Sequence, residues 1–149
     1  MINLEDLKKL RELTSAGVSD CRAALEESNG NMDKAAEILR KKGIERAAKK
    51  ADRQVKAGLI FSYIHHTGRT AAMVSLACET DFVAKTDVFQ ALGKELALHI
   101  CASSPNSVEE LLAQPYVRDA SKSISELIKE TIGKLGENIQ VIDFKTLSI

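Results

Sequence analysis

Aromatic side chains are scarce in this sequence. It contains no tryptophan, two tyrosines and four phenylalanines, so aromatic residues make up 4% of its 149 positions. An excess of one charge is also missing, because 21 lysine and arginine residues balance 21 aspartate and glutamate residues. Zero net charge argues against a general nucleic-acid or membrane-surface binder, although a local basic patch is compatible with it. With so few aromatic residues, any one on the surface has few rivals as a contact residue.

Long apolar runs and paired cysteines are missing as well. The first residues lack the basic and apolar regions of a signal peptide, and no apolar run is long enough to span a membrane. Cys21, Cys78 and Cys101 are odd in number and widely spaced, which is typical of reduced thiols in a cytosolic protein. These absences predict a soluble cytoplasmic protein without membrane contact.

No catalytic, nucleotide-binding or metal-binding motif is present. The patterns G-x-G-x-x-G, G-x-x-x-x-G-K-[ST] and G-x-S-x-G do not occur. His65 and His66 are neighbours in a strand-like segment and should point to opposite faces, which is poor geometry for one ion. His99 and Cys101 diverge by about 200° on a predicted helix and cannot share an ion either. We therefore expect no enzyme activity, no cofactor and no metal site.

Helical periodicity dominates the first 43 residues. Leucines recur one turn apart behind Asn3, a predicted N-cap. Two further apolar stripes follow, the first closed by Asn29-Gly30 and the second by Gly43. Three helices in so short a segment bury little area, which indicates a small binding module rather than an enclosed site.

Residues 44–57 favour a helix and belong to a strongly basic stretch. Between positions 40 and 56, eight lysines and arginines face only Glu45 and Asp52. Two interpretations stay open. The stretch is either a solvated connector helix between two domains, or a patch that contacts ribosomal RNA or an acidic partner surface.

The hydrophobic period changes from helix to strand at Gly58. Three segments are strand-like, namely 59–64, 72–77 and 139–142. Three helices are expected to begin at a capping signal, at Thr86 or Asp87, at 107–110 and at 123–126. A hairpin, then helices, then a returning strand predict an α+β domain with a small antiparallel sheet packed by helices.

The segment between the second predicted strand and the long helix, residues 78–85 (C-E-T-D-F-V-A-K), is expected to be a loop or one helical turn. Asp81 could cap that turn while Phe82 packs beneath it. Alternatively, a rigid turn that offers a carboxylate beside a large aromatic could enter a crevice on another protein. Aromatic anchors of that kind commonly contribute about 2 kcal/mol or more to binding.

Three segments of the sequence resemble the elongation factor Ts family. Residues 13–25 (L-T-S-A-G-V-S-D-C-R-A-A-L), followed by Asn29-Gly30, are similar to the family pattern T-x-A-G-x-x-x-C-x-x-A-L and its N-G. Residues 80–85 (T-D-F-V-A-K) match the family's T-D-F-V-A loop, and residues 132–139 (I-G-K-L-G-E-N-I) resemble its G-E-N-I segment. The three matches occur in family order and together are far more specific than any one of them.

The resemblance implies a fold in three parts. Residues 1–43 would form a ubiquitin-associated-like three-helix module, residues 44–57 a basic connector helix, and residues 58–149 an α+β core. The resemblance further implies that the core docks on elongation factor Tu, a translation GTPase. The implied activity is guanine-nucleotide exchange during translation elongation, with the nucleotide and its magnesium ion held by the partner.

The resemblance also implies two contact sites. In the family, the T-D-F-V loop inserts into the GTPase domain near the magnesium ion and promotes GDP release. The corresponding residues here are Thr80, Asp81, Phe82 and Val83. The N-terminal module supplies the second contact, for which the positions match Arg11, Val18 and Ser19. Ser19 is smaller than the apolar residue of some relatives, so this contact is expected to be smaller.

One departure from the family pattern bears on assembly. Long family members carry a second copy of the core and a helical-hairpin insertion, whereas this sequence has a single copy. A single core presents less surface, so a homodimer formed through the sheet is a hypothesis. Two other functions stay open, a protein-interaction module that uses residues 1–43 and a ribosome-associated RNA-binding protein that uses residues 40–56.

Overall fold

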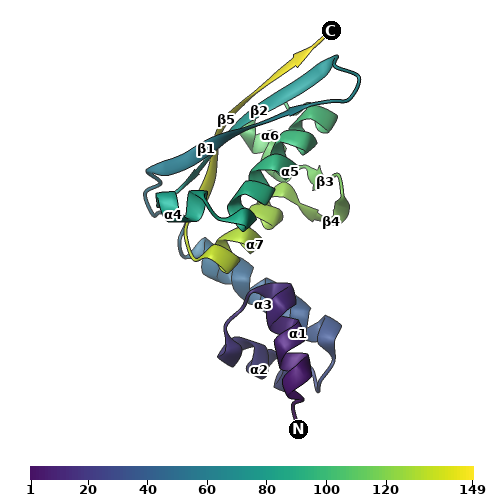
Figure 1. Cartoon of the computed structure of the whole chain (residues 1–149), viewed down its shortest axis with the longest axis vertical. Helices are drawn as coiled ribbons and strands as arrows, with labels where there is room; N and C mark the ends of the chain where they lie inside the picture. The colour runs from purple at the N-terminus through teal and green to yellow at the C-terminus, as the bar shows by residue number, and fades with distance from the viewer.

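The computed structural model describes residues 1–149 and has a small helical part and a larger α+β part (Figure 1). Three helices form the helical part, α1 (Leu4–Thr14), α2 (Val18–Glu27) and α3 (Met32–Ala48). Polar caps fix two of their beginnings, because Asn3 accepts from the backbone N–H of Glu5 and Asn31 from that of Lys34. The three predicted helices are therefore present.

The predicted end of the third helix at Gly43 is wrong. Helix α3 continues through Gly43 to Ala48, so residues 44–48 extend it and the basic segment forms no separate connector helix. A tertiary contact explains the continuation, because Gly43 packs against Gly133 of α7 (Ile124–Leu135). A Cβ atom on Gly133 would lie only 2.7 Å from the Cα atom of Gly43. Domain boundaries at 43 and 57 stay a prediction.

A three-stranded antiparallel sheet organises the α+β part. The strands β1 (Ala57–Ile64), β2 (Thr70–Cys78) and β5 (Ile139–Ser148) lie in the order β1-β2-β5. Phe61, Val74 and Phe144 pair across the three strands and face the helices. The predicted α+β fold with a small antiparallel sheet is thus confirmed.

Helices cover one face of this sheet (Figure 1). They are α4 (Asp81–Ala84), α5 (Asp87–Ser103), α6 (Val108–Ala113) and α7. Phe61 lies so close to α5 that a Cβ atom on Gly93 would be 2.1 Å from its ring. A hairpin of β3 (Pro115–Tyr116) and β4 (Asp119–Ser123), which we did not predict, links α6 to α7.

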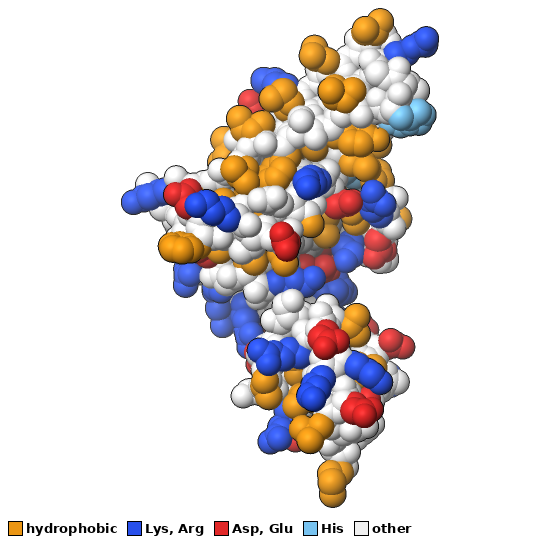
Figure 2. Space-filling view, viewed as in Figure 1, with side chains coloured by type: hydrophobic (Ala, Val, Ile, Leu, Met, Phe, Trp, Pro, Cys, Tyr) orange, Lys and Arg blue, Asp and Glu red, His pale blue; other side chains and the backbone are white.

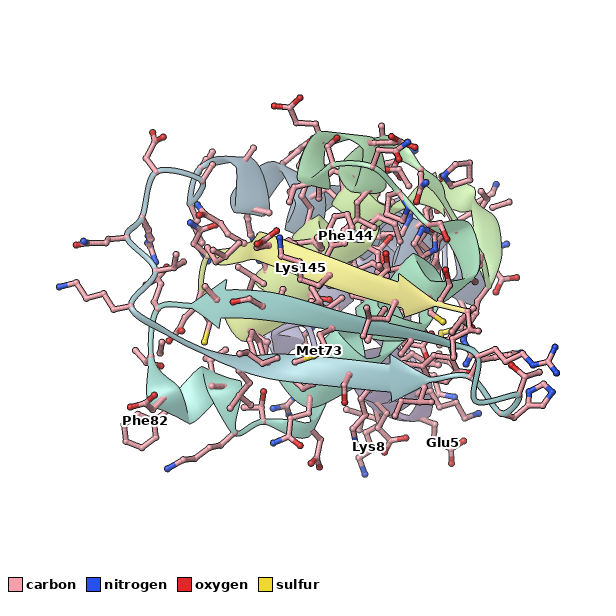
Figure 3. The ribbon with its side chains drawn as sticks, turned by 90° about the horizontal axis from the view of Figure 1, so that it is seen from above. Glu5, Lys8, Met73, Phe82, Phe144 and Lys145 are labelled. Carbon is pink, nitrogen blue, oxygen red and sulfur yellow. The ribbon has the colours of Figure 1, made fainter.

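The other face of the sheet is open. No helix covers it, and Figure 3 looks onto it from above. The apolar side chains that it exposes are Ile60, Ile64, Met73 and Leu147, which are 67%, 69%, 51% and 78% exposed. None of the helices combines the length and the hydrophobicity needed to cross a membrane.

Candidate functional site

The candidate site is α4, a single helical turn between β2 and α5. Thr80 is the N-cap of this turn, because its hydroxyl accepts from the backbone N–H of Val83 at 3.4 Å. The cap is therefore Thr80, not Asp81 as one interpretation of the sequence had it. Asp81 does not cap the helix and lies exposed at the start of the turn.

Phe82 projects from this turn into solvent. Its side chain is 87% exposed, whereas the next two residues, Val83 and Ala84, are 9% and 3% exposed. Figure 3 shows the Phe82 ring at the outer end of α4, pointing away from the rest of the chain. The interpretation that Phe82 packs beneath the turn is wrong, because Val83 and Ala84 occupy that place. Burial of its neighbours leaves Phe82 available to a partner.

Cys78 holds the end of β2 beneath the turn. Its side chain is fully buried, and its Sγ donates to the carbonyl of Thr80 at 3.2 Å. Burial raises the pKa of the Cys78 thiol, and the nearby carboxylates of Glu137 and Asp81 raise it further. A protonated thiol with a raised pKa is a poor nucleophile, so Cys78 acts here as a packing residue and a weak donor.

A set of hydrogen bonds, which we name the loop anchor, fixes the segment before α4. The Glu137 carboxylate accepts from the backbone N–H groups of Glu79 and Thr80 at 3.1 and 2.9 Å, and from the Thr80 hydroxyl at 2.7 Å. In return, the Glu79 carboxylate accepts from the backbone N–H of Asn138 at 2.8 Å. In the sequence, Glu137 stands out only as part of a family-like segment. Its contact with Thr80 spans 57 positions, so no local signal could have revealed it.

The predicted N-terminal contact residues lie on the helical part. Arg11 is in the last turn of α1, Val18 begins α2, and Ser19 follows it; all three are exposed. Leu13 was not predicted, yet it is 69% exposed in the same α1–α2 region as Val18, which is 48% exposed. The only sequence signal for the exposure of Leu13 is that it lies outside the apolar stripe of its helix.

Part of the positive charge of the basic stretch is neutralised by ion pairs. Figure 2 shows lysine and arginine side chains gathered at the waist between the two parts of the molecule. Arg46 donates two hydrogen bonds of 3.0 Å each to Asp20, and Arg40 lies 3.2 Å from Glu130. The Arg46 guanidinium holds the pKa of Asp20 below its usual value. These pairs remove free positive charge that an RNA contact would need.

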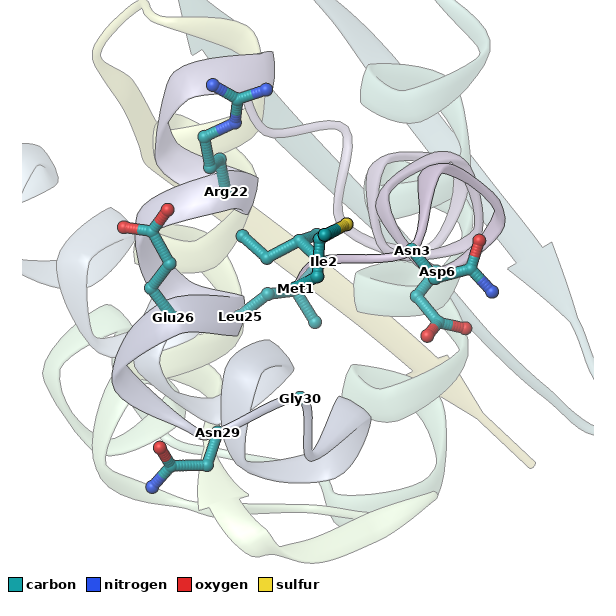
Figure 4. Close-up of a pocket in the computed structure, with 9 residues that line it drawn as sticks. All are labelled: Met1, Ile2, Asn3, Asp6, Arg22, Leu25, Glu26, Asn29 and Gly30. Carbon is teal, nitrogen blue, oxygen red and sulfur yellow. The ribbon is translucent and has the colours of Figure 1, made fainter.

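The four main cavities of the structure are lined by residues outside α4. A cavity of about 680 Å³ lies between α1 and α2 on the helical part. Figure 4 shows its lining, with Met1 and Ile2 near Leu25 and polar side chains around them. No group of three or more histidine, cysteine, aspartate or glutamate side chains is arranged to hold a metal ion.

His99 and Tyr116 belong to a structural network instead. His99 is fully buried, and its Nε2 lies 2.9 Å from the side-chain oxygen of Gln114. Burial and a hydrogen bond to Glu95 raise the pKa of Tyr116 to about 12, so its hydroxyl stays protonated and donates to that carboxylate. These bonds hold the β3–β4 hairpin against α5.

Fold and site together define a small α+β protein that presents an exposed, capped helical turn. Comparison with known proteins places this description in a family. Residues 79–149 match the family model described as Elongation factor TS. The elongation factor Ts of Fervidobacterium nodosum is 40% identical over 193 aligned positions, which cover 99% of this chain and 98% of that relative. The chain belongs to the elongation factor Ts family, a family of translation elongation factors.

Other relatives are longer than this chain. The elongation factor Ts of a Nostoc species is 46% identical over 96% of this chain, and that of Aquifex aeolicus is 43% identical over 94%. The chain spans 45% and 50% of the length of these two relatives. The alignment with the Fervidobacterium protein has more positions than the 149 residues here, so that relative also contains segments that this chain lacks.

Proposed function

We propose that this protein is the guanine-nucleotide exchange factor of elongation factor Tu and promotes GDP release by inserting the α4 turn near the partner's magnesium ion. The observation that carries the proposal is the 87% exposure of Phe82 on a turn whose neighbours are buried. Burying an exposed aromatic side chain against a partner is favourable, and aromatic residues dominate interface hot spots. The family membership of the chain and the T-D-F-V sequence of the turn add support.

The exchange needs no active site in this chain. A factor that binds the nucleotide-free GTPase more tightly than the GDP form weakens GDP binding by the same ratio, because coupling between two ligands is reciprocal. Phe82 would wedge between partner side chains, and the Asp81 carboxylate would disturb the contacts beside the magnesium ion. Loss of the cation weakens the phosphate site, since the cation neutralises phosphate charge. GTP in excess then displaces the factor.

Release of fluorescent GDP from purified elongation factor Tu tests this proposal. The native chain should accelerate release many-fold. Phe82→Ala should lose most of the acceleration with an unchanged melting temperature, because the ring makes little contact within its own chain. Val117→Ala is the matched control, since Val117 is 48% exposed on the β3–β4 hairpin. Equal rates for the native chain and Phe82→Ala would refute insertion of the turn.

The helical part would supply a second contact through Arg11, Val18 and Ser19. Its support is the exposure of these residues and of Leu13 beside them. Arg11→Ala and Val18→Ala should raise the concentration of factor needed for half-maximal release and leave the maximal rate near native. A fall in the maximal rate alone would instead assign these residues to the exchange step.

A homodimer formed through the open sheet face is our second proposal. A two-fold interface requires a patch that is complementary to itself. The open face suits this requirement because it combines apolar residues with one charge of each sign, Asp143 and Lys145, on β5. Light scattering should report twice the chain mass, and Met73→Lys should return it to the monomer mass. A native monomer with full exchange activity would eliminate the dimer.

RNA binding through residues 40–56 is disfavoured by the ion pairs of Arg40 and Arg46. If the chain fails to release GDP, binding of ribosomal RNA that weakens steeply with salt would restore that alternative. Binding of a helical partner by residues 1–43 alone would favour the interaction module.

A further inference from the structure

The α4 turn has to keep its direction without help from Phe82. A four-residue helix is far too short to be stable by itself in water, and the exposed ring contributes almost no packing. The buried side chains of Val83 and Ala84 hold the underside of the turn, and the backbone that enters it, at Glu79 and Thr80, sets where it begins. Ordering that backbone before binding removes an entropic cost from insertion.

The loop anchor supplies this order through one carboxylate. Glu137 accepts three hydrogen bonds, from the N–H groups of Glu79 and Thr80 and from the Thr80 hydroxyl. A carboxylate is a pure acceptor, and hydrogen bonds to a charged group are stronger than neutral ones. The Thr80 hydroxyl donates a hydrogen bond to Glu137, so its oxygen lone pair is turned toward the N–H of Val83. Glu137 thereby determines the cap that begins α4.

Further hydrogen bonds fix the loop anchor to the segment that precedes β1. Asn138 is 2% exposed, and its side-chain amide donates to the carbonyls of Ala51 and Arg53 at 3.3 and 2.8 Å. Its backbone N–H donates to Glu79, which also lies 3.7 Å from the Arg53 guanidinium. Two chain segments on either side of α4 are thus cross-linked by reciprocal side-chain to backbone bonds. Glu137 cannot move without breaking this set.

We infer that Glu137 is a positioning residue for nucleotide exchange, which aims the Asp81-Phe82 pair at the partner by fixing the backbone and cap of α4. This inference rests on the proposed exchange function. Glu137 is not itself a contact residue in this inference. Its effect reaches the partner only through Thr80 and the direction of the turn.

The effect differs from that of a merely structural residue. A destabilised chain contains fewer folded molecules, so it raises the concentration needed for half-maximal release but leaves the maximal rate unchanged. A turn that points in many directions leaves docking of the remaining surface intact and lowers the maximal rate. Glu137→Ala should lower the maximal rate about tenfold, the usual effect of losing a charge-assisted hydrogen bond. The half-saturating concentration should change less than about twofold.

Three variants make the experiment specific. Glu137→Gln keeps one acceptor oxygen for the two N–H groups and should recover most of the rate lost in Glu137→Ala. Thr80→Val removes the hydroxyl link, and its effect should not add to that of Glu137→Ala, because the two residues act as one unit. Glu109→Ala, on the exposed side of α6, is the control. Hydrogen exchange at the amides of Glu79 and Thr80 should speed up in Glu137→Ala.

The outcomes separate the two proposals. A lower maximal rate in Glu137→Ala with rescue by Glu137→Gln supports the positioning role. A native maximal rate in Glu137→Ala, or a change only in the half-saturating concentration, overturns the positioning role. If Phe82→Ala has lost its activity in the same assay, the exchange function is still supported. If the native chain releases no GDP from elongation factor Tu, the exchange function fails and the positioning role fails with it.

Discussion

The helical part and the α+β part differ most in the size of their hydrophobic cores. Seven residues are buried together in the helical part, and nineteen in the α+β part. Hydrophobic burial is the main stabilising contribution, so a core of seven side chains leaves the three helices dependent on further support. That support comes from α3, which contributes Leu39 to the small core and Ala47 to the large one. The three helices can thus stay folded although they would be marginal alone.

The largest expected effect comes from removing a large side chain from the small core. Leu25→Ala should cost about 3 kcal/mol, from lost burial and the cavity left behind. Because the helical part has few other buried residues, we expect it to unfold while the sheet stays folded. Hydrogen exchange should show amides of α1 and α2 unprotected and those of β2 protected.

Leu96→Ala is the matched variant in the large core, where Leu96 is fully buried. It should cost a similar free energy of unfolding, yet keep protection in both parts under native conditions. Loss of protection throughout the chain in Leu25→Ala would show that the two cores unfold as one unit, and would break the comparison.

The next effect concerns the contact between α3 and α7. Gly133→Ala should cost about 2 kcal/mol, because its Cβ would lie 2.7 Å from Gly43 and the helices would have to separate. Gly43→Ala is the control, since its Cβ would be at an ordinary 3.8 Å from Gly133. Alanine should even stabilise that helix by about 0.5 kcal/mol. Urea denaturation measures both; equal destabilisation by the two changes would contradict this packing.

A smaller effect is expected at the beginning of α7. The Ser123 hydroxyl accepts from the backbone N–H of Glu126 at 3.1 Å. Ser123→Ala removes this cap and should lower the free energy of unfolding by about 1 kcal/mol, whereas Ser123→Asp should preserve it. Thermal unfolding distinguishes them, and an alanine variant as stable as the native chain would show that the cap contributes nothing.

The smallest effect is expected from Asp20 and Arg46. The pair is exposed, so it should contribute about 0.5 kcal/mol at low salt. Arg46 lowers the pKa of Asp20 in the folded chain. The contribution is therefore fully present above the unfolded pKa and is lost as the pH falls through the lowered folded pKa. Asp20→Asn should be less stable than the native chain at pH 7 and equal to it in strong acid. A difference that persists in 1 M salt would argue against an ionic cause.

Local signals predicted much of the fold. The capping residues Thr86, Ser107 and Ser123 begin helices as expected, because each side chain bonds to a backbone N–H three residues later. Gly136 ends α7 in a left-handed conformation at φ 77°, which glycine adopts without strain. These interactions join residues only a few positions apart, so a local sequence pattern is enough to predict them.

Other features depend on distant residues and were missed. The last strand was expected to end at residue 142, but β5 continues to Ser148. Ile142 forms a bulge, because Ser75 pairs with Asp143 and Leu76 with Val141. The extra residue breaks the alternation that a strand prediction uses. The helix end at Gly43 failed for a similar reason, since the contact with Gly133 compensates for the poor helix propensity of glycine.

The candidate site was predictable in place but not in detail. The residue types of the turn predict a contact segment, which stays a prediction, yet they could not decide whether Phe82 or Val83 is buried. That choice depends on how α4 lies against the sheet, which only the folded chain determines. Local patterns could not reveal the loop anchor, because Glu137 and Thr80 are 57 positions apart in the sequence.

The reach of the loop anchor has a consequence for the order of synthesis. A ribosome joins Thr80 to the chain 57 residues before Glu137, an interval of roughly 3 to 11 seconds at about 5–20 residues per second. During that interval the nascent chain already contains the T-D-F-V segment, but the carboxylate that orders it does not yet exist. A nascent chain that has not yet reached Glu137 should therefore hold the turn less firmly, and the turn becomes ordered only after Glu137 has been added.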